Sequence, residues 1–394
     1  MKKAYVDFIR YSLGVESNIP ISIDEINWHE LYGFAQKQSI SGLLAKTILN
    51  IDGTITMDDW RGNKPIDDDV LEWMMDYNML QQLNSAAAEV SEKVSVKFER
   101  EGFASCILKG VGNSLYYPTP AMRTSGDVDV WVIPKEQLEK LEREEQLTDR
   151  QLLEIQNGCV EKVIAYCRKF VPKNKACYHH IDFLKMKGKD IEVHYRPSWL
   201  NNPNNNRELQ VYFMRNAYKC FNNKTSIDIN GVTSEFCRPT WEFNFVYQLC
   251  HVYNHLTHEG IGLRHMIDLY FLLKAAPEDR SDDAYYDALL NRLGLRKIAE
   301  AVMWIMNEIF MLDAKYQICK SNERLGRLLL KEIIIGGNFG QYDTRMFTRK
   351  TSSQTNNNIK RSMRDLMLLR YFPKETIWEP WFRWKHYFWR QRHR

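Results

Sequence analysis

Four short apolar runs interrupt a chain whose hydrophobic residues otherwise recur at helical spacing. Phe103–Leu108 is bounded by glycines, and Val128–Ile133 is rich in Val and Trp. Tyr178–Met186 and Asp190–Arg196 are separated by a Lys-Gly-Lys sequence at 187–189, which has the composition of a hairpin turn. Runs of this length are typical of strands, so the sequence predicts one small sheet inside a largely helical protein.

Helices are predicted on both sides of this sheet. Trp28–Leu49 and Val70–Val96 carry apolar residues three and four apart, and the polar segment Ile51–Asp69 between them is predicted to be a loop. Helices are expected again from Trp241 to the end, interrupted by a glycine-containing loop at Gly336–Tyr342. The expected fold class is α+β, a small mixed sheet flanked by helical regions. The expected division is residues 1–101, 102–200 and 201–394.

The segments between and after the strands are less regular. Lys135–Leu147 and Gln151–Phe170 have helical patterns. The Asn-rich stretch within Pro197–Arg207 is predicted to be a low-complexity loop. Thr225–Phe236 is predicted to be a second hairpin, because Asn230-Gly231 lies at its centre.

Composition excludes several classes of protein. Of 394 residues, 44% are hydrophobic and 26% charged, which is far from the composition of a disordered chain. The 54 basic and 50 acidic residues leave a net charge of +4, too little for a protein that coats nucleic acid. No apolar stretch is long enough to cross a bilayer, and Asp7 and Arg10 lie where a signal peptide would be apolar. We therefore expect a cytoplasmic protein.

Its eight cysteines, which form no Cys-x-x-Cys pair, are expected to be reduced and buried.

The motif most informative about chemistry is an Asp-x-Asp pair at the start of the second strand. Asp127 and Asp129 should lie on one face of that strand, while Val128 and Val130 point to the core. Two neighbouring carboxylates repel one another unless a cation neutralises them, and oxygen ligands suit Mg²⁺. The alternative is a polar strand end that caps a helix or binds Arg123.

A glycine-containing turn follows the first strand and precedes this pair. Glycine lets backbone N–H groups approach phosphate oxygens closely, and cationic side chains can offset the charge of a triphosphate. The candidate nucleotide-binding residues are Lys109, Gly110, Gly112, Ser114 and Arg123, although charged side chains near a turn are commonly just solvated. This chemistry indicates phosphoryl or nucleotidyl transfer, for which a third carboxylate is expected on a neighbouring strand. Asp182 and Glu192 are the two candidates.

The order of these motifs resembles the DNA polymerase β-like nucleotidyltransferase superfamily. A closer resemblance, over roughly residues 25–290, is to a bacterial, largely uncharacterised nucleotidyltransferase family. The motifs that carry it are LKG, YYP, GDVDVWV, IEVHYRPSW and GIGLRHMIDLYFLL. The resemblance implies that Asp127 and Asp129 bind Mg²⁺, with Mn²⁺ as the alternative. It also implies that Glu192 rather than Asp182 is the third acid and metal ligand, because Glu192 stands two residues before His194.

Four further residues are candidates for a substrate cleft: His194, His255, Arg264 and Asp268. Arg264 and Asp268 are four residues apart on a predicted helix, where an ion pair is the ordinary explanation. The resemblance includes their motif and so favours the cleft. His251, His255 and His258 share one face of the predicted helix 241–258, but we expect packing and hydrogen bonding there rather than zinc binding.

The C-terminal segment Tyr371–Arg394 interleaves four tryptophans with arginines and a lysine. We expect the tryptophans to pack against the protein, with peripheral membrane contact or nucleic-acid stacking as alternatives.

Taken together, the sequence predicts an enzyme that transfers a nucleoside monophosphate from an NTP to an acceptor hydroxyl by a Mg²⁺-dependent, three-carboxylate mechanism. A small molecule, a sugar or a protein is the favoured acceptor. An RNA end is less favoured because the net charge is nearly balanced. The alternative from another class is a non-catalytic nucleotide-binding or scaffold protein that keeps the same fold.

Overall fold

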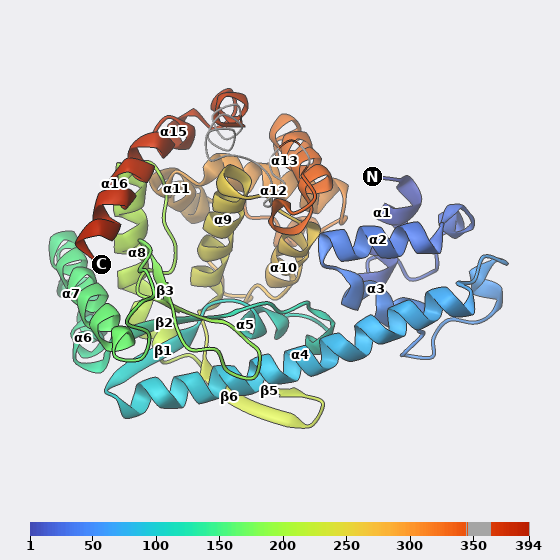
Figure 1. Cartoon of the computed structure of the whole chain (residues 1–394). Helices are drawn as coiled ribbons and strands as arrows, with labels where there is room; N and C mark the ends of the chain where they lie inside the picture. The colour runs from blue at the N-terminus through green and yellow to red at the C-terminus, as the bar shows by residue number, and fades with distance from the viewer. Residues whose placement is uncertain (344, 346–363, 394) are drawn as a thin grey trace.

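The small sheet lies between one long helix and the C-terminal helices (Figure 1). This computed structural model describes residues 1–343, 345 and 364–393; the stretch 346–363, in a region predicted to be helical, and Arg394 lie outside the described residues. The strands are β1 (Phe103–Ile107), β2 (Val128–Pro134), β3 (His180–Asp182) and β4 (Ile191–His194), in the order β1-β2-β4-β3. β2 runs parallel to β4, and both outer pairs are antiparallel. The predicted small mixed sheet is confirmed.

The two faces of the sheet contact different helices. Val130 and Val193 point to the face covered by α4 (Asp67–Arg100) and α7 (Asp149–Arg168). Trp131 points to the opposite face, where its ring lies 4.7 Å from Phe221 of α8 (Pro203–Phe221) and 5.4 Å from Phe243 of α9 (Trp241–His258). Because side chains alternate along a strand, Asp129 shares the face of Trp131 and lies under the C-terminal helices.

Helices form most of the remaining described residues, as predicted. The N-terminal helices gather at one end of α4, and α6 and α7 lie near its other end (Figure 1). The other α-helices with described bounds are α1 (Lys3–Ser12), α2 (Trp28–Gln38), α3 (Ser41–Ile48), α5 (Val111–Ser114), α6 (Lys135–Lys140), α10 (Leu263–Lys274), α11 (Asp283–Leu293), α12 (Arg296–Glu308), α13 (Glu323–Gly336), α15 (Pro373–Thr376) and α16 (Glu379–Arg392).

The second hairpin also forms as predicted. β5 (Lys224–Ile229) pairs with β6 (Val232–Cys237), and Asn230 and Gly231 both have positive φ, as this tight turn requires. The hairpin is a sheet of its own and contacts α4.

Two predicted loops extend into residues that are helical in the structure. The Asn-rich stretch starts α8, because the Asn202 side chain accepts hydrogen bonds from the backbone N–H groups of Asn204 and Asn205, and Pro203 occupies the first turn. The loop predicted to reach Asp69 ends earlier, since α4 begins at Asp67. Three aspartates in its first turn suit the positive end of the helix dipole.

The C-terminal helices are tied to the core by a buried carboxylate. Glu375 of α15 accepts hydrogen bonds from the backbone N–H groups of Asn201 (2.6 Å) and Asn202 (3.2 Å) and from the Asn205 side chain (3.0 Å). Its carboxylate thereby satisfies donors at the start of α8.

Helix α16 contacts the sheet region through one face. Phe382 and Trp389 contact the ring of Tyr178. Trp378, Trp381 and Trp384 are 38%, 37% and 63% exposed, so the predicted packing of the tryptophans is confirmed for Trp389 only.

The expected burial of the cysteines is confirmed for six of the eight, and the other two are half-buried. Among the described residues, no helix has the length and apolar character needed to cross a membrane.

Candidate active site

The strand register places Glu192 directly beside Asp129. β2 and β4 run parallel with these two residues paired, so their side chains leave the same face of neighbouring strands about 4.8 Å apart. Asp182 pairs with Glu192 from the far side, on β3, and its side chain is 70% exposed. Glu192 is therefore the acid next to Asp129, and Asp182 lies one strand further away.

His194 lies between the two carboxylates. Its Nε2 atom is 3.1 Å from Asp129 and 3.4 Å from Glu192. Burial opposes a charge on this imidazole, but the hydrogen bonds to Asp129 and Glu192 outweigh burial and raise the pKa of His194 to about 9. A protonated His194 thus occupies a position of strong negative potential, where a cation is favoured.

Asp129 has one oxygen bound and one oxygen without a partner. Its Oδ1 atom lies 3.1 Å from Lys109 Nζ as well as from His194, whereas Oδ2 is buried and accepts no hydrogen bond among the described residues. Leaving a buried carboxylate oxygen unsatisfied is costly. The residues present therefore fit a divalent cation, which would coordinate that oxygen.

Asp127 precedes β2 and is exposed at the mouth of the site. Partial loss of water around its carboxyl group, and then the negative charges of Asp129 and Glu192, raise its pKa. Burial would raise the pKa of Glu192 too, but the hydrogen bond from His194 and the charges of His180 and Lys109 lower it below its usual range.

The glycine turn after β1 brings Lys109 to this site. Gly110 has φ +64°, and a Cβ there would lie 3.5 Å from the Asp127 carbonyl oxygen, so the turn touches the backbone of the Asp-x-Asp motif. Gly112 lets α5 approach β1, because a Cβ there would lie 3.0 Å from the carbonyl oxygen of Ile107. Ser114 Oγ is buried and donates a hydrogen bond to the carbonyl of Val111.

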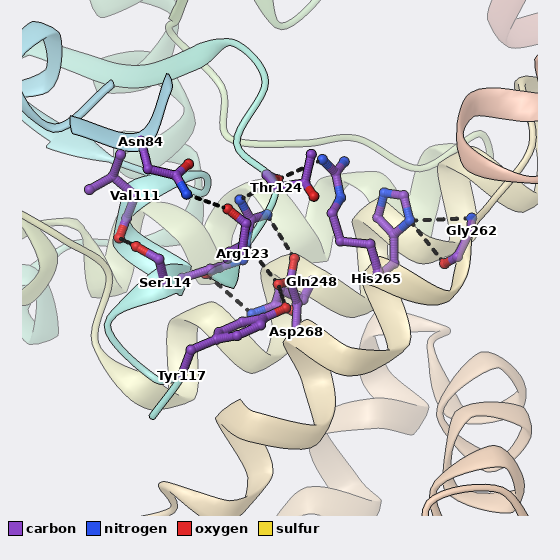
Figure 2. A network of polar contacts seen from close by, with 12 residues as sticks. Asn84, Val111, Ser114, Tyr117, Arg123, Thr124, Gln248, Gly262, His265 and Asp268 are labelled. Carbon is purple, nitrogen blue, oxygen red and sulfur yellow. Dashed lines mark hydrogen bonds and ion pairs between the residues drawn. The ribbon is translucent and has the colours of Figure 1, made fainter. Parts of the chain in front are cut away.

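Arg123 and Asp268 form a buried ion pair beside the site (Figure 2). Two guanidinium nitrogens of Arg123 donate to the two oxygens of Asp268, each at 2.8 Å, and Tyr117 donates to Asp268 at 2.7 Å. Arg264 donates to the carbonyl of Thr124 at 3.0 Å. Two of the predicted cleft residues thus hold the segment before β2 against α10.

A small cavity of about 20 Å³ adjoins these groups and is lined by the segment between β1 and β2, by α9 and by α10. That volume holds roughly one water molecule and is far too small for a nucleotide. The residues that line it are Lys109, Asn113, Arg123, Tyr247, Gln248, His251, Val252, Arg264, His265 and Asp268. The exposed side of the site is therefore the one that carries Asp127.

The fourth predicted cleft residue, His255, belongs to a separate cluster with His251 and His265. Helical spacing groups His258 with His251 and His255 and gives no sign of His265. That residue lies on α10, and helical spacing carries no information about contacts between two helices.

Comparisons with known proteins identify a family for this chain. A family model described as an uncharacterised nucleotidyltransferase matches residues 24–311, which include all three carboxylates. The comparison with curated proteins gives no match. Among solved structures, the crystal structure of an antigenic nucleotidyltransferase-like protein from Paracoccidioides brasiliensis is similar over 57% of this chain and 97% of its own, with 14% identity and a TM-score of 0.29. The family match extends over most of the chain, which therefore belongs to this family of uncharacterised nucleotidyltransferases.

Proposed function

We propose that this protein transfers a nucleoside monophosphate from an NTP to an acceptor hydroxyl and releases pyrophosphate. The observation that carries the proposal is the pairing of Asp129 with Glu192 on parallel neighbouring strands, with Asp127 at the mouth. The unpartnered oxygen of Asp129 supports a cation at this position.

Asp127, Asp129 and Glu192 are the proposed ligands of Mg²⁺. When bound, the ion neutralises the charge that develops on the phosphates. Mn²⁺ is the alternative, because it takes the same carboxylate ligands as Mg²⁺. His180, Glu192 and His194 also bring one possible ligand atom each within 4.8 Å of one another, but a protonated His194 does not bind a metal.

The protein residues contribute binding and proton transfer. The acceptor oxygen attacks the α-phosphorus, a new O–P bond forms, and the bond from that phosphorus to the pyrophosphate leaving group breaks. Glu192, whose side chain is 27% exposed, is the proposed acceptor of the proton from the attacking hydroxyl. Lys109 lies beside Asp129 and is proposed to contact the triphosphate.

The other candidate residues are proposed to act around this centre. Gly110 shapes the turn that carries Lys109, and Gly112 and Ser114 pack the same turn. We assign Arg123 and Asp268 a positioning role, because the guanidinium of Arg123 is bound to Asp268 and not directed at open space. Arg264 has the same positioning role, because it binds the carbonyl of Thr124. His194 lies beside the nucleotide, and the acceptor is a small molecule, a sugar or a protein.

The test uses matched carboxylate variants. Asp129→Asn and Glu192→Gln are compared with Asp182→Asn, an acid on the adjacent strand that the proposal does not use. With Mg²⁺ and α-labelled NTPs, label transfer to an acceptor panel that includes the protein itself should fall at least 100-fold in the first two variants. It should be unchanged in Asp182→Asn. Nucleotide binding without pyrophosphate release across the panel would instead support the non-catalytic alternative.

A further inference from the structure

Three histidines converge between α9 and α10. His251 and His255 are four residues apart and therefore lie on one face of α9, and His265 comes from the first turn of α10. Each offers a ligand atom within 4.8 Å of the other two, and the Nε2 atoms of His251 and His255 are 3.1 Å apart. Two nitrogens bound to one tetrahedral zinc ion are about 3.4 Å apart, so this spacing is close to that of a metal site.

The outer nitrogens of two of these rings lie near oxygens that can accept a hydrogen bond. His255 Nδ1 lies 3.3 Å from the carboxylate of Glu259, and His265 Nδ1 lies 3.2 Å from the carbonyl oxygen and 3.4 Å from the backbone nitrogen of Gly262 (Figure 2). In metal sites, a carboxylate or carbonyl that accepts from Nδ1–H orients the ring and leaves the Nε2 lone pair for the ion.

His265 Nε2 has no hydrogen-bond partner among the described residues, although the side chain is only 4% exposed. A buried imidazole nitrogen without a partner lowers stability unless something binds it. The arrangement thus leaves one buried ring nitrogen without a partner inside the cluster, among the described residues.

A loop from a distant part of the chain covers the cluster. The Phe339 ring lies 5.2 Å from His255 and 6.2 Å from His265. This loop touches the chain at Gly260 backbone to backbone, because a Cβ on Gly260 would lie 2.4 Å from Gly340 Cα. Such an apolar cover restricts water and competing ligands around a metal.

We propose that His251, His255 and His265 bind one transition-metal ion of the zinc class, with Glu259 orienting His255. Three nitrogen ligands suit Zn²⁺ and do not suit Mg²⁺, so this site differs in kind from the carboxylate site. Three protein ligands leave one coordination position open. His251 and His265 also line the small cavity that Lys109 borders, so the proposed site adjoins the carboxylate centre. The site does not depend on the proposed transfer reaction.

The test uses the full chain without a histidine tag, stripped of metal with a chelator. Titration with Zn²⁺ in a calorimeter should show one tight site per chain, and Co²⁺ should give the visible absorption of a tetrahedral nitrogen-ligated ion. His265→Gln should weaken binding at least 100-fold, and Glu259→Gln should weaken it 10- to 100-fold. His258→Gln is the matched control, because it lies on the same helix outside the cluster, and should bind as the wild type does.

Two further variants make the result decisive. Glu192→Gln removes the carboxylate shared by the catalytic site and the His180–Glu192–His194 group, and it should retain the Co²⁺ spectrum. If it does not, the ion occupies the carboxylate site and the proposal is wrong. If His265→Gln fails to fold, His251→Gln replaces it, because His251 is only half-buried. Absence of stoichiometric Zn²⁺ binding to the wild type would overturn the proposal outright.

Discussion

Asp268 of α10 accepts hydrogen bonds from two nitrogens of the Arg123 guanidinium. This pair joins a C-terminal helix to the segment that leads into β2. Arg123 lies four positions before Asp127 in the sequence. Asn84 of α4 donates to the carbonyl of Arg123 at 2.8 Å and holds the same segment from the other side. The position of the Asp-x-Asp motif thus depends on helices far from it in the sequence.

Breaking this ion pair should destabilise the fold. Arg123→Met leaves the buried carboxylate of Asp268 without its partner, which costs about 3–5 kcal/mol. Asp268→Leu should cost a similar amount, and the double variant should cost clearly less than the sum of the two. Urea unfolding measures all three free energies. Strict additivity would show that the pair is not the stabilising unit.

Removing the charge of Lys109 should weaken NTP binding. The Lys109 ammonium lies at the mouth of the cavity beside Asp129, and a charged hydrogen bond to phosphate contributes about 1.5–3 kcal/mol. Lys109→Met should therefore raise the dissociation constant for Mg-NTP at least tenfold, measured with a fluorescent nucleotide. Lys135→Met, an exposed lysine at the far end of β2, is the control and should have no effect.

The attachment of α16 should depend on pH. The backbone N–H of Tyr178 donates to His386 Nε2 at 2.9 Å, which requires a neutral ring. Burial, and then the charge of Arg390, lower the pKa of His386 to about 4, below the value of about 6.5 in an unfolded chain. The stability that neutral His386 supplies is therefore complete above pH 6.5 and is lost as the pH falls toward 4.

His386→Gln keeps an acceptor at this position but does not titrate. The unfolding free energy of the wild type should fall by about 2 kcal/mol more than that of the variant between pH 7.5 and 4.5. Parallel pH profiles for the two proteins would contradict the expectation.

Close backbone contact at Gly340 should make this residue intolerant of a side chain. Gly340 and Gly53 have nearly the same φ, +63° and +64°. A Cβ at Gly340 would lie 2.1 Å from the carbonyl oxygen of Glu259, whereas at Gly53 nothing lies within 4 Å. Alanine at either position costs about 1–2 kcal/mol of backbone strain. Thermal unfolding should show Gly340→Ala to be at least 2 kcal/mol more destabilising than Gly53→Ala; equal losses would mean that the loop can move away.

The sheet could be predicted from the sequence because strand composition and turn chemistry are local. Lys187 and Gly188 both adopt positive φ, which the Lys-Gly-Lys sequence permits, and Asn230-Gly231 turns the second hairpin in the same way. The start of α8 could not be predicted, because asparagines favour both loops and helix caps. Only the hydrogen bonds that the Asn202 side chain accepts distinguish a cap from a loop.

The candidate site could be predicted only in part. The Asp-x-Asp spacing is a property of one strand, but the choice between Asp182 and Glu192 depends on which strand pairs with β2. The Arg123–Asp268 pair and the contact of His265 with His251 join segments more than a dozen residues apart in the sequence. Such contacts follow from the packing of α10, which no local pattern encodes.

Glu375 and the loop at Gly340 lie beyond residue 311, where the family match ends. A shortened protein cut at that boundary would keep every carboxylate of the proposed centre. It would nevertheless lose the cover over the histidines and leave the first turn of α8 without its buried acceptor. An expression fragment designed for crystallisation or assay therefore has to extend past residue 375 to preserve the architecture described above.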